Sequence, residues 1–362
     1  MKKFWLIAAL LLGMCLPATV HAETNAQVMQ QNRTIKTKKI SERNGILLDV
    51  ARYPMTVDQI YQVIDQMNPQ KFNYLVLHLN DNEQVAFKSK YIGNQKQKTG
   101  LTADDLKEIV DYAARKQIMI VPDFDTPGHC TALIKLIKQN HPHLAKKIVN
   151  DVETLDFSHE TTVKFVEKIY REIDQACANQ PQQYMFMGGD EVAGGISNNR
   201  HLVRYFNQLN AYENKRHVKT IVWNDAVGKH NNLNKKITIA YWSQSGNTDD
   251  KQVLKSRAKS RATVSQLDKH PLINANSEYN YLMVDQLNNA TETQRFINEF
   301  NQNQTNNFNE INQKTLQNDP QSTQKQVKST GQLVCLWEGN PQKLPVQKVI
   351  EFVKNLSGYA GH

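Results

Sequence analysis

Short apolar segments that alternate with amphipathic ones constrain the fold of this chain more than any other feature. Eight such segments are rich in aliphatic, β-branched and aromatic residues, as expected of strands buried on both faces. They lie at 46–50, 74–79, 119–124, 184–187, 220–223, 237–242, 272–274 and 333–336. Strands alternating with helices over this length predict an α/β fold, a single (β/α)8 TIM barrel. An open doubly wound sheet is the alternative, although no Gly-x-Gly-x-x-Gly turn follows the first strand.

The predicted helices begin at recognisable signals. Thr56 with Gln59, and Thr102 with Asp105, have the spacing of capping boxes, and each pair precedes an apolar helical face. A third helix is expected where apolar residues recur at helical spacing over 163–173. Residues 287–328, rich in Asn and Gln, interrupt the alternation before the last strand. We expect a solvated excursion of loop and helix there, with an aggregation-prone or binding tract as the alternative.

The N-terminus predicts export. Lys2 and Lys3 precede an apolar run at 4–16, and small residues follow at 20–22, which is the layout of a secretory signal peptide over 1–22. The run is shorter than the roughly 20 residues that span a bilayer, so no membrane span is expected. Cys15 gives a weak lipoprotein alternative. We therefore expect a secreted protein, extracellular or periplasmic, with a polar lead-in at 23–40 and a catalytic barrel domain at 41–362.

Cysteine usage and charge exclude several classes of protein. Beyond the signal peptide only Cys130, Cys177 and Cys335 remain, and their odd number and wide spacing argue against a disulfide framework or a zinc site. Losing Lys2 and Lys3 lowers the formal net charge from +9 to +7. This charge favours anionic envelope polymers, but no basic run is interleaved with aromatic residues, so nucleic acid is not an expected partner. No metal or other cofactor is expected, because no His-x-His follows the first strand.

Adjacent carboxylates at Asp190 and Glu191 are the strongest candidates for chemistry. They follow an apolar strand and two glycines, Gly188 and Gly189, which permit the bend that two neighbouring acids need to share one pocket. One acid can then protonate a leaving group while the other stays ionised. An acidic strand end or a helix cap is the plainer interpretation of this motif taken alone.

Other reactive and aromatic side chains follow nearly every predicted strand. In a barrel the carboxyl ends of the strands meet at one rim, where active sites lie, so we expect these side chains to converge. Tryptophans at three strand ends are suited to stack against a sugar. The set comprises Asp49, Arg52, His78, Asp81, Asp125, His129, Trp223, Asp225, Trp242, Tyr281, Trp337 and Glu338.

The motifs at these strand ends resemble those of family 20 glycoside hydrolases, the β-N-acetylhexosaminidases. The resemblance covers about residues 43–357. It is carried, in order, by Asp49-Val50-Ala51-Arg52, His78-Leu79-Asn80-Asp81, Asp125-Thr126-Pro127-Gly128-His129, Gly188-Gly189-Asp190-Glu191, Trp223-Asn224-Asp225 and Tyr241-Trp242-Ser243. Within the family, the chain is most similar to the single-barrel hydrolases of poly-β-1,6-N-acetylglucosamine in biofilm matrix.

The resemblance implies substrate-assisted retaining hydrolysis, in which the acetamido oxygen of the sugar is the nucleophile. Glu191 would be the general acid and base, Asp190 would hold the acetamido nitrogen, and Tyr281 would bind the acetamido oxygen. Trp223, Trp242 and Trp337 would enclose the acetamido methyl group. Further substrate contacts are expected from Arg52, Asp225, Asp250 and Glu338, and supporting roles from Asp49, His78, Asp81, Asp125 and His129.

Some positions depart from the family pattern. Asp123 stands where Glu is usual, and Trp337-Glu338-Gly339 reverses the more common order of its last two residues. Gly194 and Asn247 also differ from the poly-β-1,6-N-acetylglucosamine hydrolases. The alternatives are therefore an exo-β-N-acetylhexosaminidase acting on chitin oligomers, peptidoglycan fragments or host glycans, and a barrel that binds glycan without cleaving it.

Overall fold

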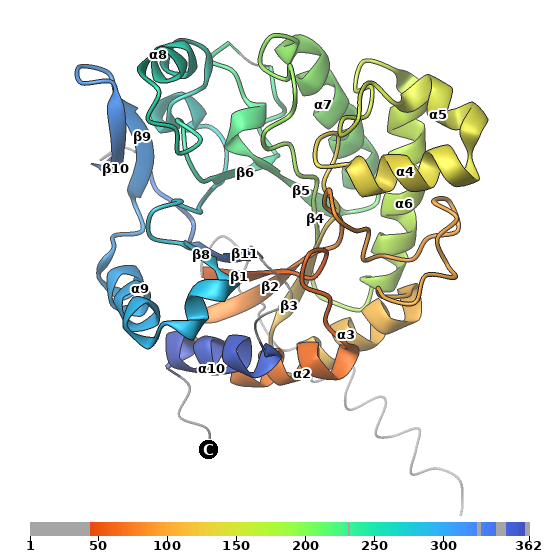
Figure 1. Cartoon of the computed structure of the whole chain (residues 1–362), viewed down its shortest axis with the longest axis horizontal. Coiled ribbons are helices and arrows are strands. Elements are labelled where there is room, and N and C mark those ends of the chain that lie inside the picture. The colour runs from red at the N-terminus through yellow and green to blue at the C-terminus, as the bar shows by residue number, and fades with distance from the viewer. Residues whose placement is uncertain (1–43, 231, 324–326, 338–344, 359–362) are drawn as a thin grey trace, which may run out of the picture. The chain divides into compact units, whose positions relative to one another are not determined.

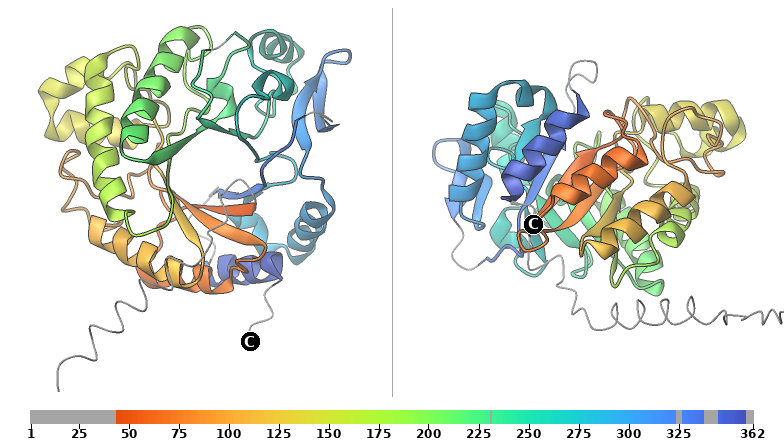
Figure 2. Two further views of the ribbon diagram at one scale, coloured as in Figure 1. Left: turned by 180° about the vertical axis from the view of Figure 1, so that it is seen from behind. Right: turned by 90° about the horizontal axis from the view of Figure 1, so that it is seen from below.

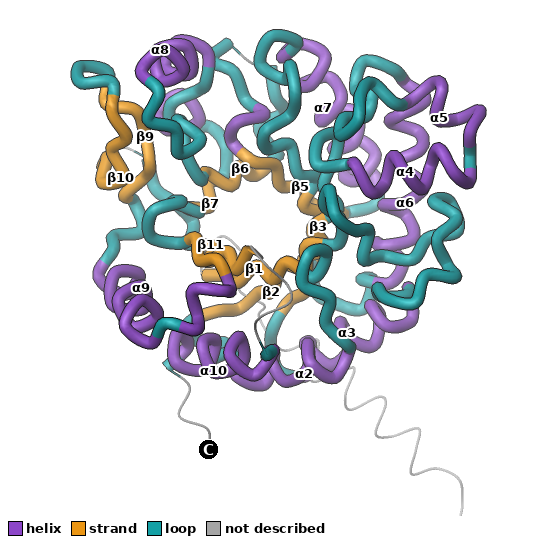
Figure 3. The backbone as a smooth tube through the Cα atoms, viewed as in Figure 1, coloured by secondary structure: helices purple, strands orange, loops and turns teal. Residues whose placement is uncertain are grey.

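Nine parallel strands form one sheet that curls into a ring, with helices around its outside (Figures 1 and 3). The computed structural model describes residues 44–230, 232–323, 327–337 and 345–358, all within one unit, 38–362. The predicted signal peptide and the lead-in lie outside these residues and stay predictions. The strands run in the order β7-β6-β5-β4-β3-β2-β1-β11-β8. Their bounds are β1 Asn44–Asp49, β2 Phe72–His78, β3 Met119–Asp123, β4 Gln183–Phe186, β5 Val218–Trp223, β6 Thr238–Tyr241, β7 Leu272–Asn274, β8 Tyr281–Met283 and β11 Leu333–Trp337.

The ring closes between β7 and β11. Asn274 bridges Gln332 in parallel, and its amide donates to the Gly331 carbonyl at 2.9 Å. Further along β11, Cys335 pairs with Tyr281 of β8. The strands β7 and β8 thus share one position in the ring, because each pairs with a different part of the same edge. Nine strands therefore make an eight-position barrel. The predicted barrel is confirmed; β8 was not predicted.

Both faces of the strands are buried, which explains why the sequence shows short apolar runs without a polar alternation. Leu47, Val76 and Val121 point into the barrel, whereas Ile46, Leu75 and Ile120 pack against the surrounding helices. Three tryptophans belong to the interior cluster at its carboxyl end, so the barrel core continues directly into the wall of the candidate site.

A helix follows most strands of the barrel. The helices are α2 Val57–Gln66, α3 Ala103–Arg115, α4 Thr131–Asn140, α5 Pro142–Ile148, α6 Glu160–Ala176, α7 Asn199–Lys215, α8 Lys251–Ser260, α9 Ala290–Gln302 and α10 Val346–Ser357. After β5 the described chain forms only the 3-10 turn Asn224–Ala226, which places its residues at the rim. Both predicted capping boxes are present, and the third predicted helix is α6, which buries its apolar face. No helix among the described residues combines the length and the apolar character needed to cross a bilayer.

The Asn- and Gln-rich stretch is more ordered than the sequence predicts. It contains α9, as expected, but also an antiparallel hairpin of β9 Asn307–Asn312 and β10 Gln317–Thr323. Phe308 and Ile311 of β9 are buried, and the ring of Phe308 lies edge-on to Tyr241 at 5.6 Å. The loop after β6 binds the hairpin through Gln244. The backbone amide of Gln244 donates to the Asn309 carbonyl and its side-chain oxygen accepts from the Ile311 amide, both at 2.9 Å. The second half of the excursion is therefore an ordered hairpin that packs against the barrel and forms a separate two-stranded sheet.

The cap of α3 gives a direct test of these local signals. The Thr102 hydroxyl accepts from the Asp105 amide at 3.1 Å, and the Asp105 carboxylate accepts from the Thr102 amide at 2.7 Å. We expect Thr102→Ala to lower the free energy of unfolding by about 1 kcal/mol and Thr102→Ser to stay near wild type, since serine caps equally well. Urea denaturation measures both variants, and an equal loss in both would show that the hydroxyl is not the stabilising group.

Candidate active site

The turn after β4 places the two adjacent acids at the mouth of the barrel. Gly188 and Gly189 have φ angles of +79° and +95°, and Glu191 itself has +46°. A Cβ atom on Gly188 would lie 1.5 Å from Asp125 Oδ1, so glycine is required for space as well as for backbone conformation. The Asp125 carboxylate fills that space and accepts from the Gly189 amide at 3.1 Å. The predicted bend is therefore present.

Asp225 fixes the position of Glu191. The Glu191 amide donates to Asp225 Oδ2 at 2.9 Å, and the indole Nε1 of Trp242 donates to Asp225 Oδ1 at 3.1 Å. Arg261, itself buried, approaches Asp225 Oδ2 to 3.5 Å. Both carboxylate oxygens of Asp225 therefore bind the protein, which makes it a positioning residue in this structure; direct contact with substrate stays a prediction.

Four aromatic rings from different strands line the mouth. Tyr281 stacks on Trp242 with centroids 5.9 Å apart and an interplanar angle of 6°. It also meets Trp337 at 5.8 Å and Trp223 at 6.4 Å, both edge-on. Trp223 and Trp337 lie 6.3 Å apart. The structure thus brings together all three tryptophans and the tyrosine that the sequence selected.

His129 lies among three carboxylates. Its Nε2 is 3.6 Å from Asp190 Oδ2 and 3.9 Å from Glu191 Oε2, and its Nδ1 is 3.8 Å from Asp81 Oδ1. Burial lowers the pKa of His129, but the charges of Asp190, Asp81 and Glu191 outweigh it, so the pKa is raised overall. The two adjacent acids and the carboxylate of Asp81 therefore favour the protonated form of His129.

The two acids differ in exposure. The Asp190 side chain is 20% exposed and that of Glu191 is 53% exposed. Burial raises the pKa of Asp190, and the His129 charge opposes this rise. Asp190 Oδ1 is buried without a hydrogen-bond partner among the described residues. A buried, unpaired carboxylate oxygen is costly unless a ligand donates to it, so the site is suited to receive an N–H or O–H group there.

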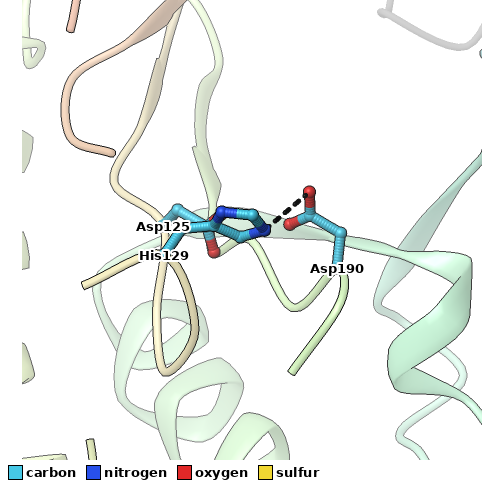
Figure 4. A group of neighbouring side chains, drawn as sticks. All are labelled: Asp125, His129 and Asp190. Carbon is cyan, nitrogen blue, oxygen red and sulfur yellow. Dashed lines mark ion pairs between the residues drawn. The ribbon is translucent and has the colours of Figure 1, made fainter. Parts of the chain in front are cut away.

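Asp125, His129 and Asp190 also have the composition of a metal site (Figure 4). One ligand atom from each lies within 4.8 Å of the other two. Burial and the neighbouring Asp190 charge raise the pKa of the fully buried Asp125 well above its usual range. The expected absence of a resident metal remains a prediction.

Behind the mouth, a chain of buried charges continues from Arg52 to Asp123. Arg52 binds Asp49 at 2.8 Å and Asp81 at 2.7 Å, and its guanidinium lies 5.3 Å from the ring of Trp337. Asp81 also accepts from His78 Nε2 at 3.0 Å, while His78 Nδ1 bonds Asp123 at 2.7 Å. The shorter aspartate at position 123 thus still reaches its histidine.

Of the two remaining predicted residues, the structure describes only Asp250. Asp250 caps α8, where its Oδ1 accepts from the amides of Gln252 and Val253 at 2.8 and 3.1 Å. Glu338 lies outside the described residues. Arg261 was not selected from the sequence, and Asn224 was named only as part of the Trp223-Asn224-Asp225 motif, without a role of its own. Asn224 orients the strand-end loop by accepting from the Trp242 amide and donating to the Ser243 carbonyl, both at 2.8 Å. Its place inside the Trp-Asn-Asp motif is a signal that could have identified it, whereas Arg261 belongs to no motif.

The charge of His78 gives a pH-dependent test. Burial lowers the pKa of His78, but the charge of Asp123 and hydrogen bonds to Asp123 and Asp81 raise it well above the usual value near 6.5. The resulting stability is fully present below the unfolded-state pKa and is lost as pH rises through the folded-state pKa. Asp81, whose pKa is lowered, adds stability that is present throughout this range.

We therefore expect His78→Gln to cost roughly 3–5 kcal/mol at about pH 6 and less at about pH 9.5. Urea unfolding at both pH values measures the difference from wild type. His143→Gln, at an exposed position, is the matched control and should change stability little at either pH. A loss that grows with pH would contradict the ion-pair assignment.

Comparison with known proteins agrees with this geometry. The profile of the glycosyl hydrolase family 20 catalytic domain matches residues 43–343. Beta-hexosaminidase subunit beta of Rattus norvegicus is 29% identical over 187 residues, which is 47% of this chain and 34% of that protein. The same subunit of Sus scrofa is 30% identical over 156 residues, which is 41% of this chain and 29% of that protein. The chain thus spans about a third of the length of the curated relatives it matches.

Two solved structures show the same fold. The structure of Dispersin B superposes with a TM-score of 0.75 at 23% identity and covers 87% of this chain and 97% of that one. A catalytic module of the pneumococcal exo-beta-D-N-acetylglucosaminidase StrH gives 0.68 at 15% identity and covers 89% and 83%. With the family profile matched over most of the described barrel, the chain belongs to glycosyl hydrolase family 20.

Proposed function

We propose that this protein is a β-N-acetylhexosaminidase that hydrolyses its substrate with the help of the substrate's own acetamido group. One observation carries the proposal: the aromatic box of Trp223, Trp242, Trp337 and Tyr281 lies at the same mouth as Asp190 and Glu191. Such a box can enclose a methyl group and the face of a sugar ring, while the adjacent acids supply the polar chemistry.

In the first step the acetamido oxygen attacks the anomeric carbon and the glycosidic bond breaks. Glu191 donates its proton to the leaving oxygen, and an oxazolinium ion forms. The more exposed position of Glu191 suits this role, because it must meet both the leaving group and the water that follows. In the second step Glu191 takes a proton from water, the water oxygen attacks the anomeric carbon, and the acetamido group is restored.

Asp190 acts on the acetamido nitrogen. Its unpaired Oδ1 can accept the N–H hydrogen bond, which orients the acetamido oxygen for attack. As the oxazolinium forms, positive charge develops beside Asp190 and lowers the carboxyl pKa that burial has raised, so the carboxylate is stabilised when it is needed. Asp225 accepts from the Glu191 amide, and His129 lies close to the carboxylates of both acids.

The proposed substrate is poly-β-1,6-N-acetylglucosamine of biofilm matrix, and the proposed place of action is outside the cell. The motif pattern supports the polymer, and the signal-like segment at 1–22 supports export. The preference for one glycosidic linkage is determined by protein groups beyond the sugar that occupies the aromatic box, so the substrate needs its own test.

To test the substrate, the purified protein is given β-1,6 and β-1,4 N-acetylglucosamine oligomers of equal length, with Glu191→Gln as the control for contaminating activity. We expect faster cleavage of the β-1,6 oligomer. Faster cleavage of the β-1,4 oligomer would replace this substrate with chitin-type oligomers. Binding without cleavage of either would leave a glycan-binding barrel.

The roles of the two acids are separated by the leaving group. Glu191→Gln should lower turnover of an oligosaccharide by roughly two to four orders of magnitude, because it removes the general acid. An activated aryl leaving group needs little protonation and should partly rescue this variant. Asp190→Asn should stay severely impaired on both substrates, at a cost of about 3 kcal/mol or more in the transition state. Steady-state kcat and KM on the two substrates measure the contrast, and equal rescue of both variants would show that the roles are assigned wrongly.

A further inference from the structure

Two segments of the chain are rich in lysine and contain no acidic residue, as does the shorter basic stretch at 251–261. Residues 84–102 contain Lys88, Lys90, Lys96 and Lys98 and no acidic residue. Residues 126–150 contain Lys135, Lys138, Lys146 and Lys147, again with no acidic residue. Without these eight lysines, the 44 basic residues of the chain fall to 36 against 35 acidic ones, so the rest of the protein is nearly neutral.

The fold brings the two segments together. The first is the loop between β2 and α3, and the second contains α4 and α5 (Figures 1 and 2). The Asn140 side chain at the end of α4 donates to the carbonyls of Ile92 and Gly93 at 3.0 and 3.3 Å. At the other end of α4, Thr131 donates to the Asn82 side chain at 2.8 Å. Two separate stretches of sequence therefore form one surface, which we call the lysine face.

The lysines of this face are available to a partner. Seven of the eight are exposed, and Lys88 is half-buried. No ion pair among the described residues involves any of them, although exposed lysines elsewhere, such as Lys107 with Asp111 and Lys164 with Glu160, are paired. The nearby Glu172 accepts a hydrogen bond from Ser89. Unpaired like charges held together on rigid elements repel one another and create a positive field that an anion relieves.

The lysine face adjoins the active site. Its loop begins directly after β2, next to Asp81, and α4 begins two residues after His129. Both segments are therefore connections at the carboxyl ends of strands, on the same side of the barrel as the catalytic mouth. A polymer bound to this face would keep the mouth close to it.

We propose that the lysine face docks a flexible, base-free polyanion linked by phosphodiesters, of the poly(glycerol phosphate) kind. All eight cations are lysines, which act as point charges and lack the planar fork with which arginine selects single groups. Of the two aromatic residues in the segments, Phe87 is buried and Tyr91 is packed by the cations of Lys90, Lys168 and Arg171. The face thus attracts phosphate charge but presents no free Phe, Tyr or Trp ring on which a nucleic acid base could stack.

The test measures binding of the purified protein to fluorescently labelled poly(glycerol phosphate) by anisotropy over a range of salt concentrations. A variant with Lys→Gln at Lys135, Lys138, Lys146 and Lys147 removes half of the face. The control removes four exposed charges elsewhere, at Lys236, Lys255, Lys259 and Lys269. Thermal unfolding of each variant verifies that the fold is intact.

We expect the face variant to bind at least about tenfold more weakly at low salt. The plot of log K against log salt should become less steep by about 3, since each phosphate contact on a single strand contributes about 0.7 to the magnitude of its slope. The control variant should bind nearly as wild type does. Equal weakening of both variants would show attraction by net charge alone and overturn the proposal. Tighter binding of single-stranded DNA of equal charge would also overturn it and point to nucleic acid. The measurement involves no hydrolysis, so it is independent of the proposed enzymatic activity.

Discussion

The hydrogen bond from the Glu191 amide to Asp225 holds the candidate site together. Glu191 follows two glycines in left-handed conformations and has a positive φ itself, a backbone state that costs free energy and needs external support. Asp225 supplies that support from the turn after the neighbouring strand β5 and at the same time holds the indole of Trp242. One carboxylate thus couples the proposed general acid, in the turn after β4, to the aromatic wall after β6. A change at either place disturbs the other, because both share Asp225.

The support extends outward to the hairpin. Arg261 approaches Asp225 and donates to the Gln244 carbonyl, and Gln244 in turn binds the backbone of β9 on both sides of Glu310. Glu310 accepts from the Val264 amide at 2.9 Å, close in sequence to Arg261. The hairpin therefore acts on the site at a distance, because it fixes the loop that carries Trp242. On the opposite side, Asp81 joins Arg52 to His78, so the mouth is held between a hydrogen-bonded clamp and a chain of buried charges.

Local signals allowed the sequence to predict the strands, the capped helices and the gathering of strand-end residues. Thr56 and Thr102 cap helices through neighbours three residues away, and the apolar runs reflect burial on both faces. The hairpin could not be predicted in this way, because β9 has the polar sequence Asn-Phe-Asn-Glu-Ile-Asn. Its Asn309 and Glu310 side chains are buried and bind partners that are distant in sequence. Arg261 was missed for the same reason, since its partner Asp225 belongs to another element. Tertiary contacts, not local propensity, decide both.

Catalytic precision and surface charge are carried by different parts of the barrel. The candidate catalytic residues lie on the strands or on turns directly after them, where strand pairing and buried hydrogen bonds restrict movement. The lysines lie farther along the same connections, on a loop and two helices whose buried side chains pack into the core. Because exposed charges on such segments affect folding little, the charge of the rim can change while the geometry at Glu191 stays fixed. The same scaffold can therefore be directed to different surroundings without alteration of its chemistry.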